Sequence, residues 1–406
     1  SKTIKKIIEL TKAGANAFRL NCSHLEEKDL EEYIEKIRKA EKIINKPIGI
    51  LIDLQGPKIR IGEVSKNDNI LESGNSFFID NLKEIGNSKR VHLSDRKVFK
   101  SVKKGHLILI DDGNIHLKVT SVQNNIIRTK ILQGGIIKSN KGINLPDSNL
   151  KTSALSSSDK KYVKIAINFD VNWIALSFVQ RSSDIKELKK FCNNKISIMA
   201  KIEKPSALKY INEICEIADG IMIARGDLGV ELPIETVPGW QKTIIQTSRV
   251  KGKPVVVSTQ MLESMTSSLT PTRAEVSDVA NAVFEGADTI MLSAESASGN
   301  YPVEAVKMMH KIAFSTENEK NYNNIIANQI EQTPNTTPDA IATAAKTLAD
   351  ELSSPIIVCY TESGSTGIKV SRVRPSQTIL TITPVINTAR KLSLVWGVLC
   401  LLQKDE

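Results

Sequence analysis

The feature that most constrains the fold is a repeat of short apolar runs separated by helical patterns. Two runs come early, at Asn16–Leu20 and Ile48–Asp53. Five more follow residue 147, namely Trp173–Leu176, Ile198–Lys201, Gly220–Ala224, Pro254–Ser258 and Thr289–Leu292. Apolar runs that alternate with helices indicate a parallel sheet of βα units. Seven such units predict a TIM (β/α)8 barrel whose first strand is missing from this chain, and an open doubly wound α/β sheet is the alternative.

The chain changes character between residues 58 and 146. Short strands with Asn, Gly and Asp turns replace the helices, as in HLILIDDGN and NIIRTKIL. This pattern predicts an inserted all-β lid domain, a small β-barrel. The catalytic barrel domain would then comprise residues 1–57 and 147–324.

A third unit is expected after a polar linker at residues 325–336. Residues 337–406 contain a helical pattern at Ala340–Glu351 and apolar runs at Ile356–Tyr360 and 378–383. These alternate as in an α/β unit. Because the chain stops soon after this pattern starts, we expect a C-terminal α/β regulatory domain that is truncated.

Charge and cysteine content exclude several classes of protein. The net charge is +10, but no basic tract is interleaved with aromatic residues, so we expect the lysines to coat solvated faces rather than bind nucleic acid. A positive field would also favour phosphorylated substrates. No apolar run approaches the roughly 18 residues that a membrane span needs. The five scattered cysteines have no CxxC spacing, which indicates a reducing cytoplasm rather than disulfides or zinc.

Polar side chains follow all seven apolar runs. In a TIM barrel the carboxyl ends of the strands meet at one face, where the chemistry takes place. We therefore expect one ring of functional residues, formed by Arg19, Asn21, Ser23, His24, Asp53, Ser177, Lys201, Glu203, Arg225, Gly226, Asp227, Thr259, Gln260, Ser293 and Glu295.

The composition of this ring indicates metal-assisted chemistry on an anion. Glu203 and Asp227 offer hard oxygen ligands suited to Mg²⁺ or Mn²⁺, and salt bridges to Lys201 or Arg225 are the alternative. A lysine beside a divalent metal suits phosphoryl transfer or enolate chemistry, while a Schiff base is the competing role. No Walker A motif and no GxGxxG is present, so side chains would have to hold any nucleotide.

Specific motifs resemble those of the pyruvate kinase family along nearly the whole chain. They include DLQGPKIRIG, KIEKPSAL, ADGIMIARGDLGVE, KPVVVSTQMLESM and PTRAEVSDVANAVFEGADTIMLSAES. The resemblance implies a TIM barrel with a β lid inserted after the third strand and a C-terminal α/β regulatory domain. It also implies the last step of glycolysis, in which phosphoenolpyruvate and ADP give pyruvate and ATP and enolpyruvate is protonated at C3.

The resemblance assigns roles to residues of the ring. Lys201 and Arg19 would contact the transferring phosphoryl group, and Glu203 with Asp227 would hold Mg²⁺. Backbone N–H groups of Gly226 and Asp227, with Thr259, would bind the substrate carboxylate. The proton relay to C3 would involve Thr259 and Ser293. The nucleotide phosphates and a second Mg²⁺ would lie along Asn21, His24, Arg60 and Lys141, with the lid residue Asp112 facing the site.

Two departures from the family pattern concern its monovalent-cation site. That site corresponds to Asn21, Ser23, Asp53 and the Leu54 carbonyl. Lys58 stands where many members have Glu, and Leu54 stands where those members have Thr. A fixed ammonium can replace a bound cation, so we expect that K⁺ is not required. The alternative is that Lys58 points into solvent at the lid hinge.

The resemblance also covers regulation and assembly. The turn formed by Thr361, Ser363, Gly364, Ser365 and Thr366 resembles the effector-phosphate loop of the family. Glu362 stands where fructose-1,6-bisphosphate-activated members have Lys, so we expect a monophosphorylated sugar, a nucleoside monophosphate or no effector. A cytoplasmic homotetramer is expected. A metal-dependent aldolase or lyase acting on pyruvate-like acids, or an RNA-binding protein, remains the alternative.

Overall fold

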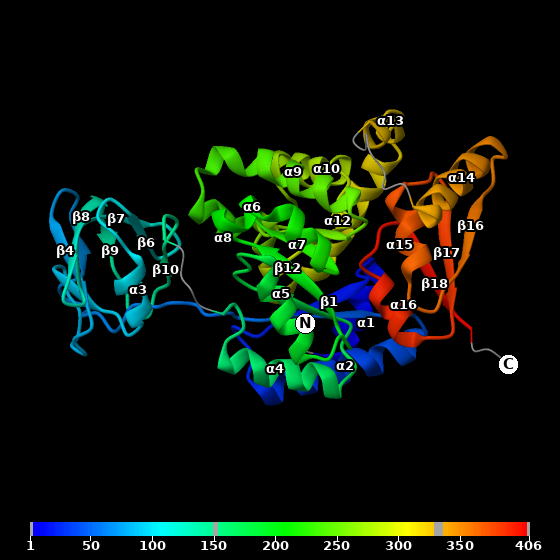
Figure 1. Ribbon diagram of the computed structural model, residues 1–406. Coiled ribbons are helices and arrows are strands. Elements are labelled where there is room, and N and C mark those ends of the chain that lie inside the picture. The colour runs from blue at the N-terminus through cyan, green and yellow to red at the C-terminus, as the bar shows by residue number, and fades with distance from the viewer. Residues whose placement is uncertain (1–2, 149–152, 329–335, 404–406) are drawn as a thin grey trace.

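The structure is a computed structural model that describes residues 3–148, 153–328 and 336–403. Figure 1 shows three units side by side: a β-rich unit at one end, a central sheet surrounded by helices, and a second α/β unit at the other end. No helix within the described ranges is both long and apolar enough to cross a membrane.

Seven parallel strands form the central sheet, in the order β1-β2-β11-β12-β13-β14-β15. They span Ala17–Asn21, Gly49–Asp53, Trp173–Leu176, Ser197–Ile202, Gly220–Ala224, Val255–Ser258 and Thr289–Met291. The seven predicted strands are therefore confirmed, each to within one residue at either end. The sheet curls with its helices outside, as in a barrel with one strand fewer than eight (Figure 1).

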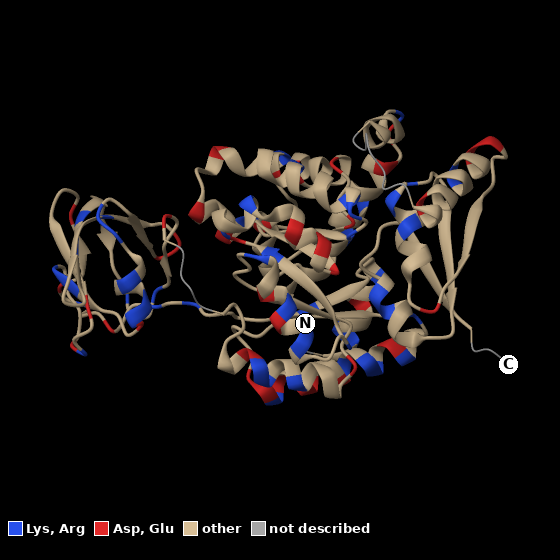
Figure 2. Ribbon diagram, viewed as in Figure 1, with Lys and Arg blue, Asp and Glu red and all other residues tan. Residues whose placement is uncertain are grey.

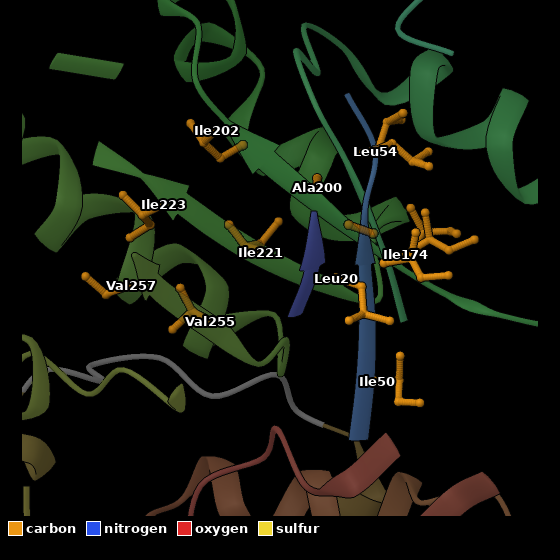
Figure 3. Close-up of a cluster of buried hydrophobic side chains, with 14 of the residues drawn as sticks. Leu20, Ile50, Leu54, Ile174, Ala200, Ile202, Ile221, Ile223, Val255 and Val257 are labelled. Atoms are coloured by element: carbon orange, nitrogen blue, oxygen red, sulfur yellow. The ribbon is translucent and has the colours of Figure 1, made fainter. Parts of the chain in front are cut away.

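Alternation along the strands gives the sheet two apolar faces. In β2, Ile50 and Ile52 pack under the outer helices, whereas Leu51 between them joins an inner cluster with Trp173 and Met222. Figure 3 shows how the outer set from successive strands forms one continuous layer. Successive side chains of a strand point to opposite faces, so a strand covered on both faces must be apolar throughout.

Helices on the outer side complete the central unit. Several begin at side-chain caps that the sequence supplies, such as the reciprocal pairs Ser156–Asp159 and Thr272–Glu275. The helices are α1 (Ile4–Ala13), α2 (Glu27–Ile44), α4 (Ser157–Asn168), α5 (Ser182–Phe191), α6 (Pro205–Lys209), α7 (Ile211–Ile217), α8 (Arg225–Glu231), α9 (Val237–Val250), α10 (Arg273–Phe284), α11 (Ala294–Ala297), α12 (Pro302–Glu317) and α13 (Tyr322–Ala327), with 3-10 turns η1 (Ile234–Thr236) and η2 (Glu263–Thr266).

The lid unit is built on a six-stranded sheet in the order β10-β6-β7-β8-β4-β5, with a separate pair β3-β9. Its strands span Ile70–Leu71 (β3), Ser76–Asp80 (β4), Arg90–His92 (β5), Leu107–Ile110 (β6), Ile115–Gln123 (β7), Ile126–Gln133 (β8), Gly135–Ile136 (β9) and Ile143–Asn144 (β10). The expectation of an all-β insert is wrong in one respect. A short helix, α3 (Arg96–Ser101), begins where the Asp95 side chain accepts a hydrogen bond from the N–H of Lys97.

Two antiparallel segments pair at the start and end of the lid. Arg60 lies opposite Gly142, and the N–H of Ile143 donates to the Ile59 carbonyl at 2.9 Å. We call these paired segments, residues 59–61 and 141–143, the stalk.

The C-terminal unit is a parallel sheet, β16-β17-β18, with three helices. The elements are α14 (Thr337–Glu351), β16 (Ile356–Tyr360), α15 (Ser365–Arg372), β17 (Thr378–Thr383), α16 (Ile386–Leu392) and β18 (Val398–Leu402). The sequence had not indicated β18. The predicted linker is wrong at its start, because α13 continues to Ala327, and its residues 329–335 lie outside the described residues.

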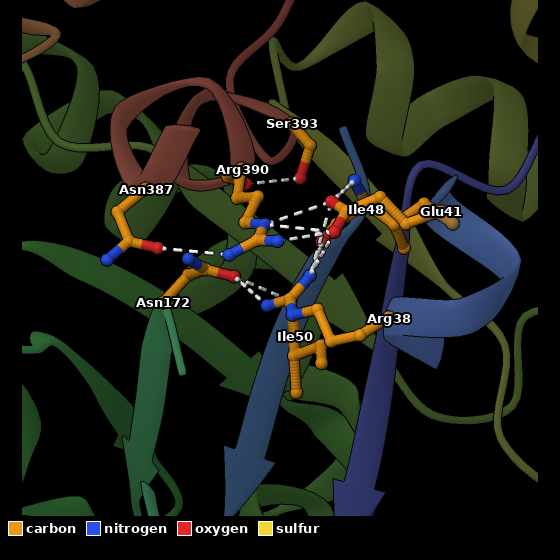
Figure 4. Close-up of polar contacts among 8 residues, drawn as sticks. All are labelled: Arg38, Glu41, Ile48, Ile50, Asn172, Asn387, Arg390 and Ser393. Atoms are coloured by element: carbon orange, nitrogen blue, oxygen red, sulfur yellow. Dashed lines mark hydrogen bonds and ion pairs between the residues drawn. The ribbon is translucent and has the colours of Figure 1, made fainter. Parts of the chain in front are cut away.

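The C-terminal unit packs on the end of the barrel where the strands begin. Arg390 of α16 forms an ion pair with Glu41 of α2, which also binds Arg38 (Figure 4). Trp173, the first residue of β11, donates its indole N–H to the Lys391 carbonyl at 3.1 Å. This end is opposite the face on which the predicted ring lies.

Candidate active site

The centre of the candidate site is the ammonium group of Lys201 on β12. Its Nζ lies 3.0 Å from Asp53 Oδ1 and 2.7 Å from Glu203 Oε1. It also donates to the Ser177 hydroxyl at 2.8 Å. All four side chains are buried, and they come from the ends of β2, β11 and β12. The structure therefore brings these predicted ring residues together.

Asp53 is held from its other side by Arg19 of β1. Arg19 Nε and Nη2 lie 2.7 and 2.6 Å from Asp53 Oδ2. Asp53 thus has one cation on each oxygen. Ser177, for which the sequence suggested no specific role, completes the arrangement by donating to the Leu54 carbonyl at 2.7 Å.

The charges in this cluster stabilise one another. Burial alone would raise the pKa of Asp53, but Lys201 and Arg19 outweigh it and lower that pKa. Burial likewise disfavours the charged lysine, yet Asp53 and Glu203 raise the pKa of Lys201 above its usual value. An ammonium held by two carboxylates is a fixed positive charge, not the neutral amine that a Schiff base would need. The Schiff-base alternative is therefore disfavoured.

Glu203 and Asp227 are carboxylates whose charges interact, and together they could hold a divalent cation. Burial, together with the charge of Asp227, raises the pKa of Glu203 although Lys201 opposes the shift. Asp227, in the first turn of α8, makes no hydrogen bond or ion pair among the described residues, and Arg225 pairs instead with Asp278 at 2.7 Å. The expected alternative of an Arg225–Asp227 bridge is thus wrong, whereas the Lys201–Glu203 bridge is present. Two carboxylates, of which that of Asp227 has no ion-pair partner among the described residues, are suitable ligands for Mg²⁺ or Mn²⁺.

Other oxygens would have to complete such a metal site. Within residues 3–148, 153–328 and 336–403, no group of three or more His, Cys, Asp or Glu side chains is arranged for a metal ion. Hard cations that keep open positions take water or substrate oxygens there.

A strained turn lies beside the carboxylate pair. Thr259 and Gln260, directly after β14, both have positive φ, at 71° and 53°. The guanidinium of Arg225 holds the Thr259 carbonyl at 2.6 Å, and the N–H of Gly226 donates to Thr259 Oγ1 at 2.8 Å. Non-glycine residues persist in this conformation only where the surroundings enforce it, which is typical of ligand sites. Neither the strain nor the bracing by Arg225 was foreseen, since the Asp278 that orients Arg225 is 53 residues away.

Ser293 lies just after β15, and Glu295 holds its backbone in place by a hydrogen bond. The buried Glu295 carboxylate accepts from the N–H of Ser293 at 2.7 Å and from that of Leu262 at 3.2 Å. Glu295 therefore braces two loops, and this contact accounts for its place in the predicted ring.

The expected nucleotide residues lie in two separate groups. On the stalk, Arg60 is exposed and Lys141 is partly exposed, and Lys141 pairs with Asp111 at 2.7 Å. Asn21 ends β1 and the exposed His24 follows it, and the Asn21 side chain accepts from the N–H of Ser23. No hydrogen bond or ion pair joins the two groups in the described part of the chain.

Lys58 lies against the stalk rather than on Asp53. It is exposed, and its Cε lies 3.0 Å from the point where a Cβ on Gly142 would stand. Asp53 is occupied by Arg19 and Lys201 instead. The role of Lys58 as a cation substitute stays a prediction.

The lid contacts the site through α8. Gly113, next to the exposed Asp112, has a Cβ position 3.6 Å from Val230, and the Asn144 amide donates to Glu231 at 2.9 Å. Asp112 itself has a positive φ of 52°. In the C-terminal unit, the predicted effector loop leads into α15, with Thr361 Oγ1 accepting from the N–H of Gly364 at 3.0 Å.

Comparison with protein families assigns residues 1–306 to the pyruvate kinase barrel domain and residues 339–406 to the pyruvate kinase alpha/beta domain. The chain belongs to the pyruvate kinase family. A pyruvate kinase of Methylorubrum extorquens is 46% identical over 405 residues, which cover 100% of this chain and 85% of that protein. One from Thermotoga maritima is 40% identical, covering 97% of this chain and 83% of that protein.

Solved structures agree. A pyruvate kinase from Cryptosporidium parvum matches with a TM-score of 0.94 and 34% identity, covering 99% of this chain and 84% of that one. The barrel and the C-terminal α/β unit expected from the sequence are therefore those of a pyruvate kinase. Pyruvate kinases generally use Mg²⁺ and K⁺, and the Glu203–Asp227 pair provides oxygens suited to the first of these.

Proposed function

We propose that the chain transfers the phosphoryl group of phosphoenolpyruvate to ADP, giving pyruvate and ATP, with the ring at the strand ends as its active site. The observation that carries the proposal is the position of Lys201 Nζ between Asp53 and Glu203, whose pKa the charge of Asp227 raises. Phosphoryl transfer needs positioning and charge neutralisation more than covalent help. A buried ammonium beside a carboxylate pair supplies both.

Each part of the site has a separate task. Lys201 and Arg19 neutralise charge on the transferring phosphoryl group, and Asp53 keeps both cations in place. The N–H groups of Gly226 and Asp227, with the Thr259 hydroxyl, bind the substrate carboxylate. Glu203 and Asp227 would hold Mg²⁺, which, when bound, neutralises charge on the substrate oxygens. Protonation of enolpyruvate at C3 then runs through Thr259 and Ser293.

The nucleotide enters between barrel and lid. Asn21 and His24 contact its phosphates from the barrel side, and Arg60 and Lys141 from the stalk, when the lid closes and excludes water. The separation of the two groups in the structure suits a site that closing the lid completes. The proposed division into a catalytic domain (1–57 and 147–324), a lid (58–146) and a regulatory domain (337–406) follows these roles.

We further propose that the reaction needs no K⁺. Both oxygens of Asp53 already face cations, and the Leu54 carbonyl already accepts a hydrogen bond from Ser177. Two expected ligands of the family's monovalent-cation site are therefore occupied. Lys58 adds a third positive charge at the nearby stalk.

Regulation and assembly follow the family pattern in this proposal. The loop at Thr361–Thr366 takes a sugar monophosphate or nucleoside monophosphate, since Glu362 repels a bisphosphate. The enzyme is a cytoplasmic homotetramer. Its cysteines support a reducing compartment, since all five are free and four are buried.

A coupled assay tests the central proposal. With phosphoenolpyruvate, ADP and Mg²⁺, pyruvate formation is followed through lactate dehydrogenase while ATP is measured separately. We expect both products in equal amounts. A metal-dependent lyase would give no ATP, and that result would overturn the proposal.

A further inference from the structure

Phe178 follows the active-site strand β11 by two residues and has a left-handed backbone, with φ at 55°. Most non-glycine residues with positive φ in the described ranges are Asn or Asp, which tolerate this conformation, whereas an aromatic residue adopts it rarely. A bulky side chain persists there only where its surroundings enforce it. The contacts of Phe178 therefore have to account for this turn.

The backbone of Phe178 holds Glu203. Its N–H donates to Glu203 Oε2 at 2.8 Å, while Oε1 of the same carboxylate lies 2.7 Å from Lys201 Nζ. Glu203 is buried, so both of its oxygens are held inside the protein. A carboxylate bound at both oxygens cannot rotate freely, and the Phe178 N–H therefore determines which oxygen faces Lys201.

The ring of Phe178 lies against the start of the lid. Gly56, which precedes the stalk, is buried and has a φ of 69°. A Cβ on Gly56 would stand 2.7 Å from Phe178 Cδ2, closer than side-chain atoms pack. The chain that leads into the lid thus passes directly over the ring, and only glycine leaves room for it.

A cation links the same ring to the end of the lid. Lys204 Nζ lies over the ring, 5.6 Å from its centroid, and pairs with Glu231. Glu231 also accepts a hydrogen bond at 2.9 Å from Asn144 of β10, the last strand of the lid. The lid stands apart from the barrel at one end of the molecule (Figure 2). Contacts at its two ends can therefore transmit its position to the site, and Phe178 is connected to both ends.

We propose that Phe178 is a positioning residue of the reaction, whose turn orients Glu203 and whose ring conveys the position of the lid to that carboxylate. The inference rests on the proposed role of Glu203 in holding Mg²⁺. Phe178 acts through Glu203 and supplies no group to the phosphoryl transfer itself. Changing a residue that orients a metal ligand alters metal affinity by about 10–100-fold. Because movement of the ring shifts the N–H that holds Glu203, metal binding and lid position are linked, and the linkage acts in both directions.

Binding of Mn²⁺ to the whole chain without substrate tests the turn. Free Mn²⁺ is measured by electron paramagnetic resonance, and Glu203→Gln identifies the part of the binding that belongs to this site. Phe178→Ala lacks the ring that enforces the turn, so its Mn²⁺ affinity should fall about tenfold or more. Phe178→Gly accommodates positive φ without strain and should lose less affinity. Phe178→Tyr keeps the ring and should bind as the unmodified chain does.

Hydrogen exchange tests the connection to the lid. The backbone amides of residues 58–61 and 140–146 should exchange faster in both Phe178→Ala and Phe178→Gly, because neither variant has a ring against Gly56. They should exchange at the unmodified rate in Phe178→Tyr. Phe78→Ala is the matched control for metal binding. It removes a partly exposed ring of the lid that also lies under a cation, Arg128, and it should leave the Mn²⁺ affinity unchanged.

The two measurements separate the two parts of the proposal. Unchanged Mn²⁺ affinity in Phe178→Ala, or equal losses in Phe178→Ala and Phe178→Gly, would overturn the role of the turn. Unchanged exchange in both variants would overturn the connection to the lid. Unchanged Mn²⁺ binding in Glu203→Gln would overturn the metal role of Glu203 and this inference with it. Since neither measurement uses turnover, failure of the coupled assay is a separate result that concerns the proposed reaction.

Discussion

The amide of Asn144 on the lid donates to the carboxylate of Glu231 at the last residue of α8, at 2.9 Å. Lys204, which follows the active-site strand β12, pairs with the same carboxylate oxygen, while the other oxygen is buried without a partner among the described residues. The first turn of α8 carries Gly226 and Asp227. One buried side chain therefore connects the lid to the helix that we expect to bind substrate.

This connection can be broken by a single charge. In Asn144→Asp, two carboxylates would face each other where a hydrogen bond stood, so the lid should separate from α8. We expect faster hydrogen exchange at residues 140–146 and a fall in kcat/KM of about tenfold or more, because a 1.4 kcal/mol loss has that effect. Asn125→Asp, in the exposed β7–β8 turn, is the control. Unchanged exchange and kinetics in Asn144→Asp would show that the contact does not control the lid.

Lys201→Met tests the proposed role of the central ammonium. The substitution keeps bulk but removes the positive charge, so kcat should fall by about 10³-fold or more, as for other electrostatic groups of this kind. KM for phosphoenolpyruvate should change much less. Because Asp53 and Glu203 lose a shared cation, the melting temperature should also fall. Lys209→Met, exposed at the end of α6, should alter neither quantity. Near-normal turnover in Lys201→Met would contradict the assignment.

Glu203→Gln and Asp227→Asn test the metal pair. Each removes one anionic ligand from a hard cation, so the Mg²⁺ concentration for half-maximal activity should rise sharply in both variants. Glu213→Gln, exposed on α7, serves as the matched carboxylate control. If either site variant titrates with Mg²⁺ as the unmodified chain does, that carboxylate is structural.

Activity in a tetramethylammonium buffer free of K⁺ and NH₄⁺ tests cation independence. We expect added KCl to raise the rate less than about tenfold, the factor that 1.4 kcal/mol supplies. Lys58→Glu should create a K⁺ requirement, although a weak one while Leu54 remains. Larger activation of the unmodified enzyme would contradict the proposal that the reaction needs no K⁺.

The lid contains an ion pair whose contribution should depend on pH. Arg90 binds both oxygens of the buried Asp80, at 2.5 and 2.9 Å. Burial alone would raise the pKa of Asp80, but the bonds from Arg90 lower it. A carboxylate with a lowered pKa stabilises the fold above its ordinary pKa of about 3.9 and loses that contribution as the pH falls through the lowered value.

Thermal melts of Asp80→Asn at pH 7, 5 and 3 measure this contribution. At pH 7 the variant should be less stable by about 1.5–3 kcal/mol, the range for hydrogen bonds to charged groups. The difference should persist at pH 5 and shrink at pH 3. Glu84→Gln removes the exposed partner of the same arginine and should have little effect. A difference that grows on acidification would contradict the sign of the shift.

The barrel strands could be predicted from the sequence because they are buried. Strands such as β13, buried along its full length, leave a continuous apolar run that no surface helix produces. The apolar run at Val398–Leu402, which forms β18, was not predicted as a strand, because no helical pattern that would mark a further βα unit follows it. The helix α3 was not predicted, because its six residues are too few to show the hydrophobic period that distinguishes a helix from a turn.

The proximity of several candidate site residues could be predicted from the sequence, but their contacts could not. Strand ends place Lys201, Glu203 and Asp53 on one face, so their proximity followed from the fold alone. The contacts made by Ser177, and the bracing of the Thr259 turn by Arg225, depend on hydrogen bonds between segments far apart in the chain. Such pairings leave no local pattern to detect.

The stalk has a consequence for protein engineering. Because the N–H of Ile61 donates to the Lys141 carbonyl at 2.9 Å, the segments that open and close the lid lie side by side. The strands on either side, β2 and β11, are already neighbours, with Asp53 opposite Ala175. We therefore expect that the lid can be removed as a module. A linker of a few residues could bridge the gap at small entropic cost, and a different domain could be inserted there without changing the register of the barrel.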